Sequence, residues 1–260
     1  MNPWIGLLRK EWRISKLWII TTVGIVIAVN IVAYLLALKY DEPVTMFFPS
    51  LIVTCLHAFY MLIFMALSLQ TETKRLHLWL QTPQSVFRLV SAKLLIAFGS
   101  LLVSLFVSAL FTYIASLEIK ERYFHEEMWN HELFIQAGVL AVLSIVLLSI
   151  HMAIWCLFYW VIYRICKQMF PKLSGLIVAL IYFLLGWLFS LFMKTNVYEW
   201  LTGWGKVAMP GVAFKYDTTE GWIMIEKIET IAIGVIVFYG IIAVLVFCAS
   251  IWLIDRKVEV

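Results

Sequence analysis

Six long, uncharged apolar runs constrain this chain more than any other feature of its sequence. About twenty apolar residues in a helix cross the ~30 Å hydrocarbon core of a bilayer. The runs cover approximately Leu17–Leu38, Pro49–Leu69, Leu94–Leu117, Leu133–Ile162, Ser174–Met193 and Thr230–Ile254. Continuous runs favour helices, because the strands of membrane barrels alternate over about ten residues. We therefore expect an all-α, polytopic membrane protein with six transmembrane helices.

Composition supports a bilayer as the solvent of this chain. Of its 260 residues, 63% are hydrophobic and 14% are charged, whereas soluble domains are about 45–50% apolar and about 25% charged. The four cysteines form no CxxC pair, so we expect neither a disulfide framework nor a metal site.

The distribution of positive charge predicts the orientation in the membrane. Six spans place both termini on one side. The segments on that side contain 13 of the 20 Lys and Arg residues but four of the 16 acidic residues. Because cytoplasmic loops are enriched in Lys and Arg, we expect cytoplasmic N- and C-termini in a multi-pass protein of the cell (plasma) membrane.

The N-terminal segment, residues 1–16, has the pattern of an amphipathic interfacial helix. Trp4, Leu8 and Trp12 share one helical face, and Arg9 and Arg13 lie on another. Such a helix places tryptophan in the membrane interface and cations near lipid phosphates. The alternative is a simple basic anchor that only orients the first span.

The rest of the chain, residues 17–260, is predicted to be a single transmembrane domain. Its longest outer loop, residues 194–229, is rich in aromatic residues. We expect this loop to fold back into the outer interface as short helices. The alternative is an ordinary aromatic belt that flanks the last two spans.

Small polar residues form two stripes within the spans. Ser100, Ser104 and Ser108 repeat every four residues in the third span, and Ser144 and His151 share a face of the fourth. Stripes of this kind let helices approach closely and form hydrogen bonds, so we favour a packing role. The alternative is that they line a substrate path.

The sequence offers no catalytic group. No Asp, Glu, Lys or Arg lies deep inside a span, and nothing matches the phosphate-binding pattern GxxxxGK[ST]. The loop residues His125, Glu126, Glu127 and His131 fit no zinc motif, and we interpret them as part of a solvated acidic loop. If ATP drives this protein, another chain must bind the nucleotide.

The cytoplasmic loop at residues 70–93 contains a short helical pattern. Leu76, Trp79 and Leu80 give an apolar face, Pro83 ends the helix, and Ser85 can cap the next one. A short helix parallel to the membrane can occupy a groove of a soluble partner. It can equally be a connector between two spans.

This loop resembles that of the permease subunits of type-2 ABC exporters. The matching residues are Glu72, the pair Trp79 and Leu80, the step Thr82 and Pro83, then Ser85, and finally Ala92 and Lys93. The opening at Leu8–Arg13 also resembles the start of that family. The sequence departs from the family at Lys74 and Arg75, which replace a usual Gly-Thr step, and at Ala92, which replaces a glycine.

The resemblance implies a membrane subunit that is not itself an enzyme. It would pair with a second permease, identical or related, and dock a cytoplasmic ABC ATPase that binds ATP and Mg²⁺; membrane lipid surrounds it, and no nucleic-acid partner is expected. Coupling to the ATPase would involve Glu72, Lys74, Arg75, Leu76, Trp79, Leu80 and Pro83. Family substrates include antibiotics, antimicrobial peptides, lipids and polysaccharides.

Three other classes stay open. An ion-coupled secondary transporter would need a titratable group in the spans, where the sequence offers only histidines. A membrane enzyme would need a catalytic pair. A non-transporting immunity or accessory protein would have the same sequence features as the exporter subunit.

Overall fold

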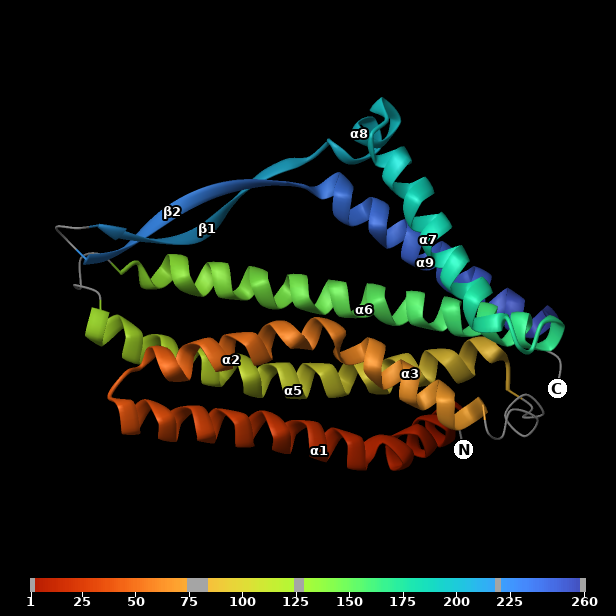
Figure 1. Cartoon of the computed structure of the whole chain (residues 1–260), viewed down its shortest axis with the longest axis horizontal. Helices are drawn as coiled ribbons and strands as arrows, with labels where there is room; N and C mark the ends of the chain where they lie inside the picture. The colour runs from red at the N-terminus through yellow and green to blue at the C-terminus, as the bar shows by residue number, and fades with distance from the viewer. Residues whose placement is uncertain (1–2, 74–83, 124–128, 218–220, 258–260) are drawn as a thin grey trace. The chain divides into compact units, whose positions relative to one another are not determined.

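Helices dominate the structure, a computed structural model that describes residues 3–73, 84–123, 129–217 and 221–257 (Figure 1). Within these ranges, six helical segments are long and apolar enough to cross a membrane. They are α1 (Pro3–Tyr40), α2 to α3 (Val44–Thr73), α5 (Val86–Tyr123), α6 (His131–Met169), α7 (Ser174–Met193) and α9 (Ile233–Lys257). The prediction of six apolar helices of membrane-spanning length is confirmed.

The limits of these helices follow the apolar runs, and most helices extend past them. The fifth run coincides with α7, and the third and fourth lie inside α5 and α6, which have 38 and 39 residues. At about 1.5 Å per residue, α5 and α6 are each nearly 60 Å long, roughly twice the hydrocarbon thickness. If they cross a membrane, their ends must therefore extend beyond the hydrocarbon core, or the helices must tilt away from the membrane normal.

The second apolar segment is not one regular helix. It consists of α2 (Val44–Leu56), a 3₁₀ turn η1 (His57–Phe59) and α3 (Tyr60–Thr73), with Pro49 inside α2. A mid-helix 3₁₀ turn changes the direction of the side chains that follow it. Here it carries His57 and Ala58, which are both buried.

Residues 3–16 form the first turns of α1, and the helix continues past Lys16 without a break. The buried positions of this segment are Leu7, Glu11 and Ser15, spaced every four residues. Trp12, on the predicted apolar face, is exposed. The boundary expected between an interfacial helix and the first span is therefore not marked by any change in backbone.

The aromatic-rich segment after α7 differs from the prediction of short helices. It contains one short helix, α8 (Asn196–Thr202), followed by the paired strands β1 (Lys206–Asp217) and β2 (Gly221–Ala232). Because only three residues join the strands, the pair must be antiparallel. The all-α class is corrected accordingly: the protein is mostly helical and carries one β-hairpin.

The hairpin has a physical basis in its sequence. β-branched residues are frequent in β2, among them Ile223, Ile225 and Ile228, and β1 contains Val207 and Val212. These residues fit a pleated strand better than a helix. The last long helix, α9, begins at Ile233, three residues after the start of the sixth apolar run. The residues from Thr230 to Ala232 belong to β2 instead.

The chain forms two compact units, and every contact described below lies within one of them. The first comprises the described parts of Met1–Met61, Ala92–Ile150 and Pro210–Glu229, and the second comprises the described parts of Leu62–Ser91, His151–Met209 and Thr230–Val260. In the first unit, Ala37, Met46 and Ala115 form a buried cluster against Phe47 and Phe111. In the second, Phe192 of α7 stacks on Phe238 of α9 at 6.0 Å between ring centroids.

Candidate functional site

A buried ion pair joins α1 to the beginning of α5. Lys93 Nζ donates a hydrogen bond of 2.8 Å to Glu11 Oε2, and the two side chains are 1% and 2% exposed. The other carboxylate oxygen, Glu11 Oε1, lies 3.8 Å from Nζ of Lys10, whose side chain is 47% exposed. Glu11 and Lys93 are separated by 82 positions in the sequence, so no local pattern predicts their contact.

The position of Glu11 follows from the helical repeat of α1. Leu7, Glu11 and Ser15 lie four residues apart and share the buried face. Burying two charges is costly, and their attraction offsets that cost only when the geometry is good. Removing one partner of a buried pair costs about 3–5 kcal/mol, whereas replacing both by apolar residues is often neutral. The pair therefore specifies how these two helices meet more than it adds net stability.

A buried polar seam connects α1, α2 and α5 in the first unit. Ser50 Oγ donates to Asn30 Oδ1 at 2.6 Å, and the Thr54 hydroxyl lies 2.8 Å from that of Ser108 and 2.9 Å from that of Thr112. We use the name polar seam for these five residues. Their hydroxyl and amide groups form hydrogen bonds with one another across the helix interfaces, so these helix faces are packed together.

Three further hydrogen bonds extend this pattern around η1. His57 Nε2 lies 2.9 Å from Ser104 Oγ, and the Tyr60 hydroxyl lies 3.1 Å from the hydroxyl of Thr22. Ser149 Oγ accepts the backbone N–H of Met61 at 3.1 Å. This last bond occupies a backbone donor just after the 3₁₀ turn.

The predicted serine stripe on the third span is buried as a whole. Ser104 and Ser108 make the interhelical contacts above, while Ser100 bonds to the carbonyl of Ala97 in its own helix. Ser144 is exposed and bonds to its own Leu140 carbonyl. The structure therefore does not bring Ser144 to the serines of α5, and the α6 serine used for packing is Ser149.

His151 belongs to the second unit, in an aromatic cluster. Trp155 Nε1 donates to His151 Nε2 at 2.9 Å, and the His151 ring lies 5.8 Å from the ring of Tyr239 in α9. Phe189 of α7 lies 6.1 Å from the same tyrosine. These rings link α6, α7 and α9, which agrees with the packing role expected for His151 and identifies its aromatic neighbours.

Most of the predicted coupling residues lie outside the described residues. These are Lys74, Arg75, Leu76, Trp79, Leu80 and Pro83. Glu72 lies in the last turn of α3, so the start of the coupling segment is continuous with the second span. The adjacent Thr73 accepts a hydrogen bond of 3.2 Å from Trp160 Nε1 of α6. After the loop, α5 begins at Val86, as the capping position of Ser85 predicts.

The predicted interfacial anchor is divided between exposed and partly buried positions. Trp4 and Leu8 are partly buried, and Arg9, Trp12 and Arg13 are exposed. Arg9, Lys10 and Arg13 line a surface hollow of about 440 Å³. Exposed cations and an exposed tryptophan agree with a membrane surface location, which remains a prediction.

An exposed ion pair stands at the other end of α1. Arg122 donates two hydrogen bonds to the Asp41 carboxylate, at 2.9 and 2.8 Å, and the Tyr123 hydroxyl donates to Glu42. Hydrogen bonding to Arg122 and its positive charge hold the pKa of Asp41 below the ordinary value of 3.8. Asp41 also has a φ of 53°, a left-handed conformation that aspartate tolerates at a helix end.

No metal or catalytic cluster is found among the described residues. No group of three or more His, Cys, Asp or Glu side chains in those ranges could hold a metal ion. His131 begins α6, and its Nε2 lies 3.4 Å from the hydroxyl of Tyr113, while His125, Glu126 and Glu127 lie outside the described residues. No family model, curated protein or solved structure matches the chain.

Proposed function

We propose that this chain is the membrane-spanning permease subunit of a type-2 ABC exporter. Its termini and the loop at residues 70–93 would face the cytoplasm of a plasma-membrane protein, and a separate ATPase subunit would bind ATP and Mg²⁺. A second permease, identical or related, would complete the transport path. The cargo is an antibiotic, an antimicrobial peptide or a lipid-like molecule.

The observation that carries the proposal is the ion pair between Glu11 and Lys93. The resemblance to exporter permeases rests on two stretches far apart in the sequence, the opening at Leu8–Arg13 and the loop that ends at Lys93. The 2.8 Å contact joins these two stretches, and both of its side chains are almost completely buried. The two segments on which the resemblance rests are thus in contact with each other.

The pair also gives the chain a way to transmit motion. Lys93 lies about two helical turns into α5 from Val86, next to the loop that an ATPase would contact. Because the pair is buried, replacing either partner by water has a large free-energy cost. A displacement of the start of α5 must therefore move α1 or break the contact. The family resemblance implies an ATPase as the partner of the loop. The ion pair between Glu11 and Lys93 connects that loop to the first span.

The buried charges favour this class over an ion-coupled transporter. Among the described residues, Glu11 and Lys93 are the buried carboxylate and ammonium and pair with each other, and the buried His57 of η1 is hydrogen-bonded to Ser104. Ion coupling needs titratable groups that exchange their partners near the middle of the membrane. A strong ion pair near the start of two helices is better suited to a structural link than to binding and releasing protons.

Copurification tests the proposal. The tagged chain is purified from membranes of its source cells after mild crosslinking, and its partners are identified by mass spectrometry. We expect an ATPase with a P-loop in about equal amount, and its loss when residues 74–83 are replaced by a Gly-Ser linker of the same length. Transport by the purified chain alone, driven by a proton or sodium gradient, would overturn the proposal.

A further inference from the structure

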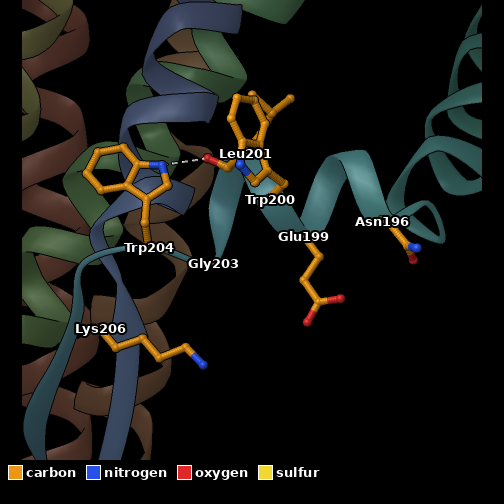
Figure 2. Close-up of a pocket in the computed structure, with 7 residues that line it drawn as sticks. All are labelled: Asn196, Glu199, Trp200, Leu201, Gly203, Trp204 and Lys206. Atoms are coloured by element: carbon orange, nitrogen blue, oxygen red, sulfur yellow. Dashed lines mark hydrogen bonds between the residues drawn. The ribbon is translucent and has the colours of Figure 1, made fainter.

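The segment that links α7 to β1 forms a second candidate site (Figure 2). Helix α8 and the residues after it surround a pocket of about 660 Å³ in the second unit. Its lining residues are Asn196, Glu199, Trp200, Leu201, Gly203, Trp204 and Lys206. The volume lies within the usual range for small-molecule sites, about 300–1,000 Å³.

The length of α7 places this pocket at the membrane surface. The 20 residues of α7 span about 30 Å, which is the thickness of the hydrocarbon core. Helix α8 begins at Asn196, and only Lys194 and Thr195 separate it from the end of α7 at Met193. Trp200 and Trp204 are 78% and 50% exposed, as is typical of tryptophans at the level of lipid headgroups.

Close backbone packing holds the pocket in place. The N–H groups of Ile233 and Gly234, at the start of α9, donate to the carbonyls of Gly205 and Trp204 at 3.1 and 3.2 Å. A Cβ atom at Gly234 would lie 2.6 Å from the Thr202 carbonyl oxygen, so no larger residue fits there without a shift of the backbone. Trp204 Nε1 is fixed by a 2.8 Å hydrogen bond to the Leu201 carbonyl.

The charged and aromatic side chains of the pocket are separated. In Figure 2 the indoles of Trp200 and Trp204 lie on one side of the backbone between α8 and β1, and Glu199 and Lys206 extend on the other. Both charged side chains are exposed, and within the described residues they form no ion pair with each other. The pocket is therefore lined by a carboxylate and an ammonium that do not form an ion pair with each other.

We propose that this pocket binds the headgroup of a zwitterionic phospholipid, a phosphate linked to an amine. The ammonium of Lys206 pairs with the phosphate, and the carboxylate of Glu199 pairs with the amine. The two indoles contact the glycerol and upper acyl region, where tryptophan is favoured. Glu199 and Lys206 both lie outside the loop at residues 70–93, so the inference does not depend on the proposed function.

Native mass spectrometry of the full chain in detergent tests this inference. The protein is titrated with phosphatidylethanolamine or with phosphatidylglycerol, whose headgroup has the phosphate but no amine. Removing an exposed charge partner is worth up to about 1 kcal/mol, so Glu199→Gln should weaken phosphatidylethanolamine binding about fivefold. Glu199→Gln should leave phosphatidylglycerol binding unchanged, whereas Lys206→Gln should weaken binding of both lipids.

A matched variant and a soluble competitor complete the test. Lys194→Gln removes an exposed cation immediately after α7 that does not line the pocket, and it should bind both lipids like the unmodified chain. Water-soluble O-phosphorylethanolamine distinguishes the ligand source: failure to compete supports a lipid, and competition at equal concentration supports a free phosphoamine in the same site. Equal lipid selectivity in Glu199→Gln and the unmodified chain, or equal binding by Lys206→Gln and Lys194→Gln, would overturn the inference.

Discussion

Glu11 and Lys93 show how strongly the environment of a residue can alter its role. In the sequence, Glu11 lies in a helical segment rich in Arg and Lys, where a surface position would be expected for it. In the folded chain its carboxylate is buried against an ammonium 2.8 Å away. A substitution here removes one member of a buried ion pair, and such changes are among the few that destabilise a protein by several kcal/mol.

We predict that Glu11→Gln and Lys93→Met each lower the free energy of unfolding by about 3 kcal/mol, because each removes one partner of a buried ion pair. The double variant Glu11→Leu with Lys93→Met should recover most of that loss. Unfolding in mixed micelles of detergent and sodium dodecyl sulfate measures these changes. Lys10→Gln is the matched control, since its exposed cation should contribute less than about 1 kcal/mol. Equal effects of Glu11→Gln and Lys10→Gln would contradict the prediction.

At the scale of helices, the polar seam determines which faces meet. Asn30 and Ser50 join α1 to α2, and Thr54 joins α2 to Ser108 and Thr112 of α5. Single hydrogen bonds between membrane helices average about 0.6 kcal/mol. The seam therefore adds a modest stability, but it distinguishes the correct pairing of apolar helices from the many others that would bury similar area.

A double-mutant cycle on Thr54→Val and Ser108→Ala tests the seam. We expect a coupling free energy of about 0.6 kcal/mol between the two substitutions, because each removes one side of the same 2.8 Å contact. Unfolding in mixed micelles provides the measurement. Thr54→Val combined with Ser144→Ala should show no coupling, since the Ser144 hydroxyl bonds to its own helix. A coupling as large in the control pair as in the seam pair would show that the cycle does not report this contact.

The β-hairpin is the element that sequence reasoning missed. Its aromatic residues predicted interfacial helices, whereas β-branched residues such as Val207, Ile223 and Ile225 favour strands. Those residues, together with the short connection after Asp217, were the available signal for a hairpin. Between two apolar helices, such a signal competes with the general expectation of helical structure in membrane proteins.

At the scale of the whole molecule, the proposed function requires force to pass from the loop at residues 70–93 to the spans. Glu72 is part of α3, and the loop is followed by α5, so the second and third spans both receive any displacement of the loop. The ion pair at Lys93 extends that displacement to α1. In the proposed function, three spans would thus respond to a displacement of the loop at residues 70–93.

We predict that Glu72→Lys and Trp79→Ala uncouple ATP hydrolysis from transport in the reconstituted complex. Substrate transport should fall at least about tenfold, equivalent to about 1.4 kcal/mol of coupling free energy, while basal ATP hydrolysis and the fold are retained. Asp255→Lys is the control for charge reversal, because Asp255 is an exposed acid near the C-terminal end of α9. Full ATPase association together with unchanged transport in the two loop variants would show that the loop has no coupling role.

The sequence by itself determined the number and approximate limits of the spans. In hydrocarbon every backbone N–H and C=O must be paired within its own segment, so an uncharged run of twenty apolar residues has few alternatives to a helix. The serine repeat of α5 was likewise readable, because a period of four residues places Ser100, Ser104 and Ser108 on one face.

Only the tertiary structure decided which polar groups meet. A local pattern assigns Glu11 to a helix face but does not say whether that face meets water, lipid phosphate or another helix. Its partner lies 82 residues away in the sequence, and the α6 serine that packs is Ser149 instead of the predicted Ser144. In an apolar chain the hydrophobic pattern is nearly the same on all sides of a helix, so the choice of neighbours depends on a few polar contacts that exist only after the helices have packed.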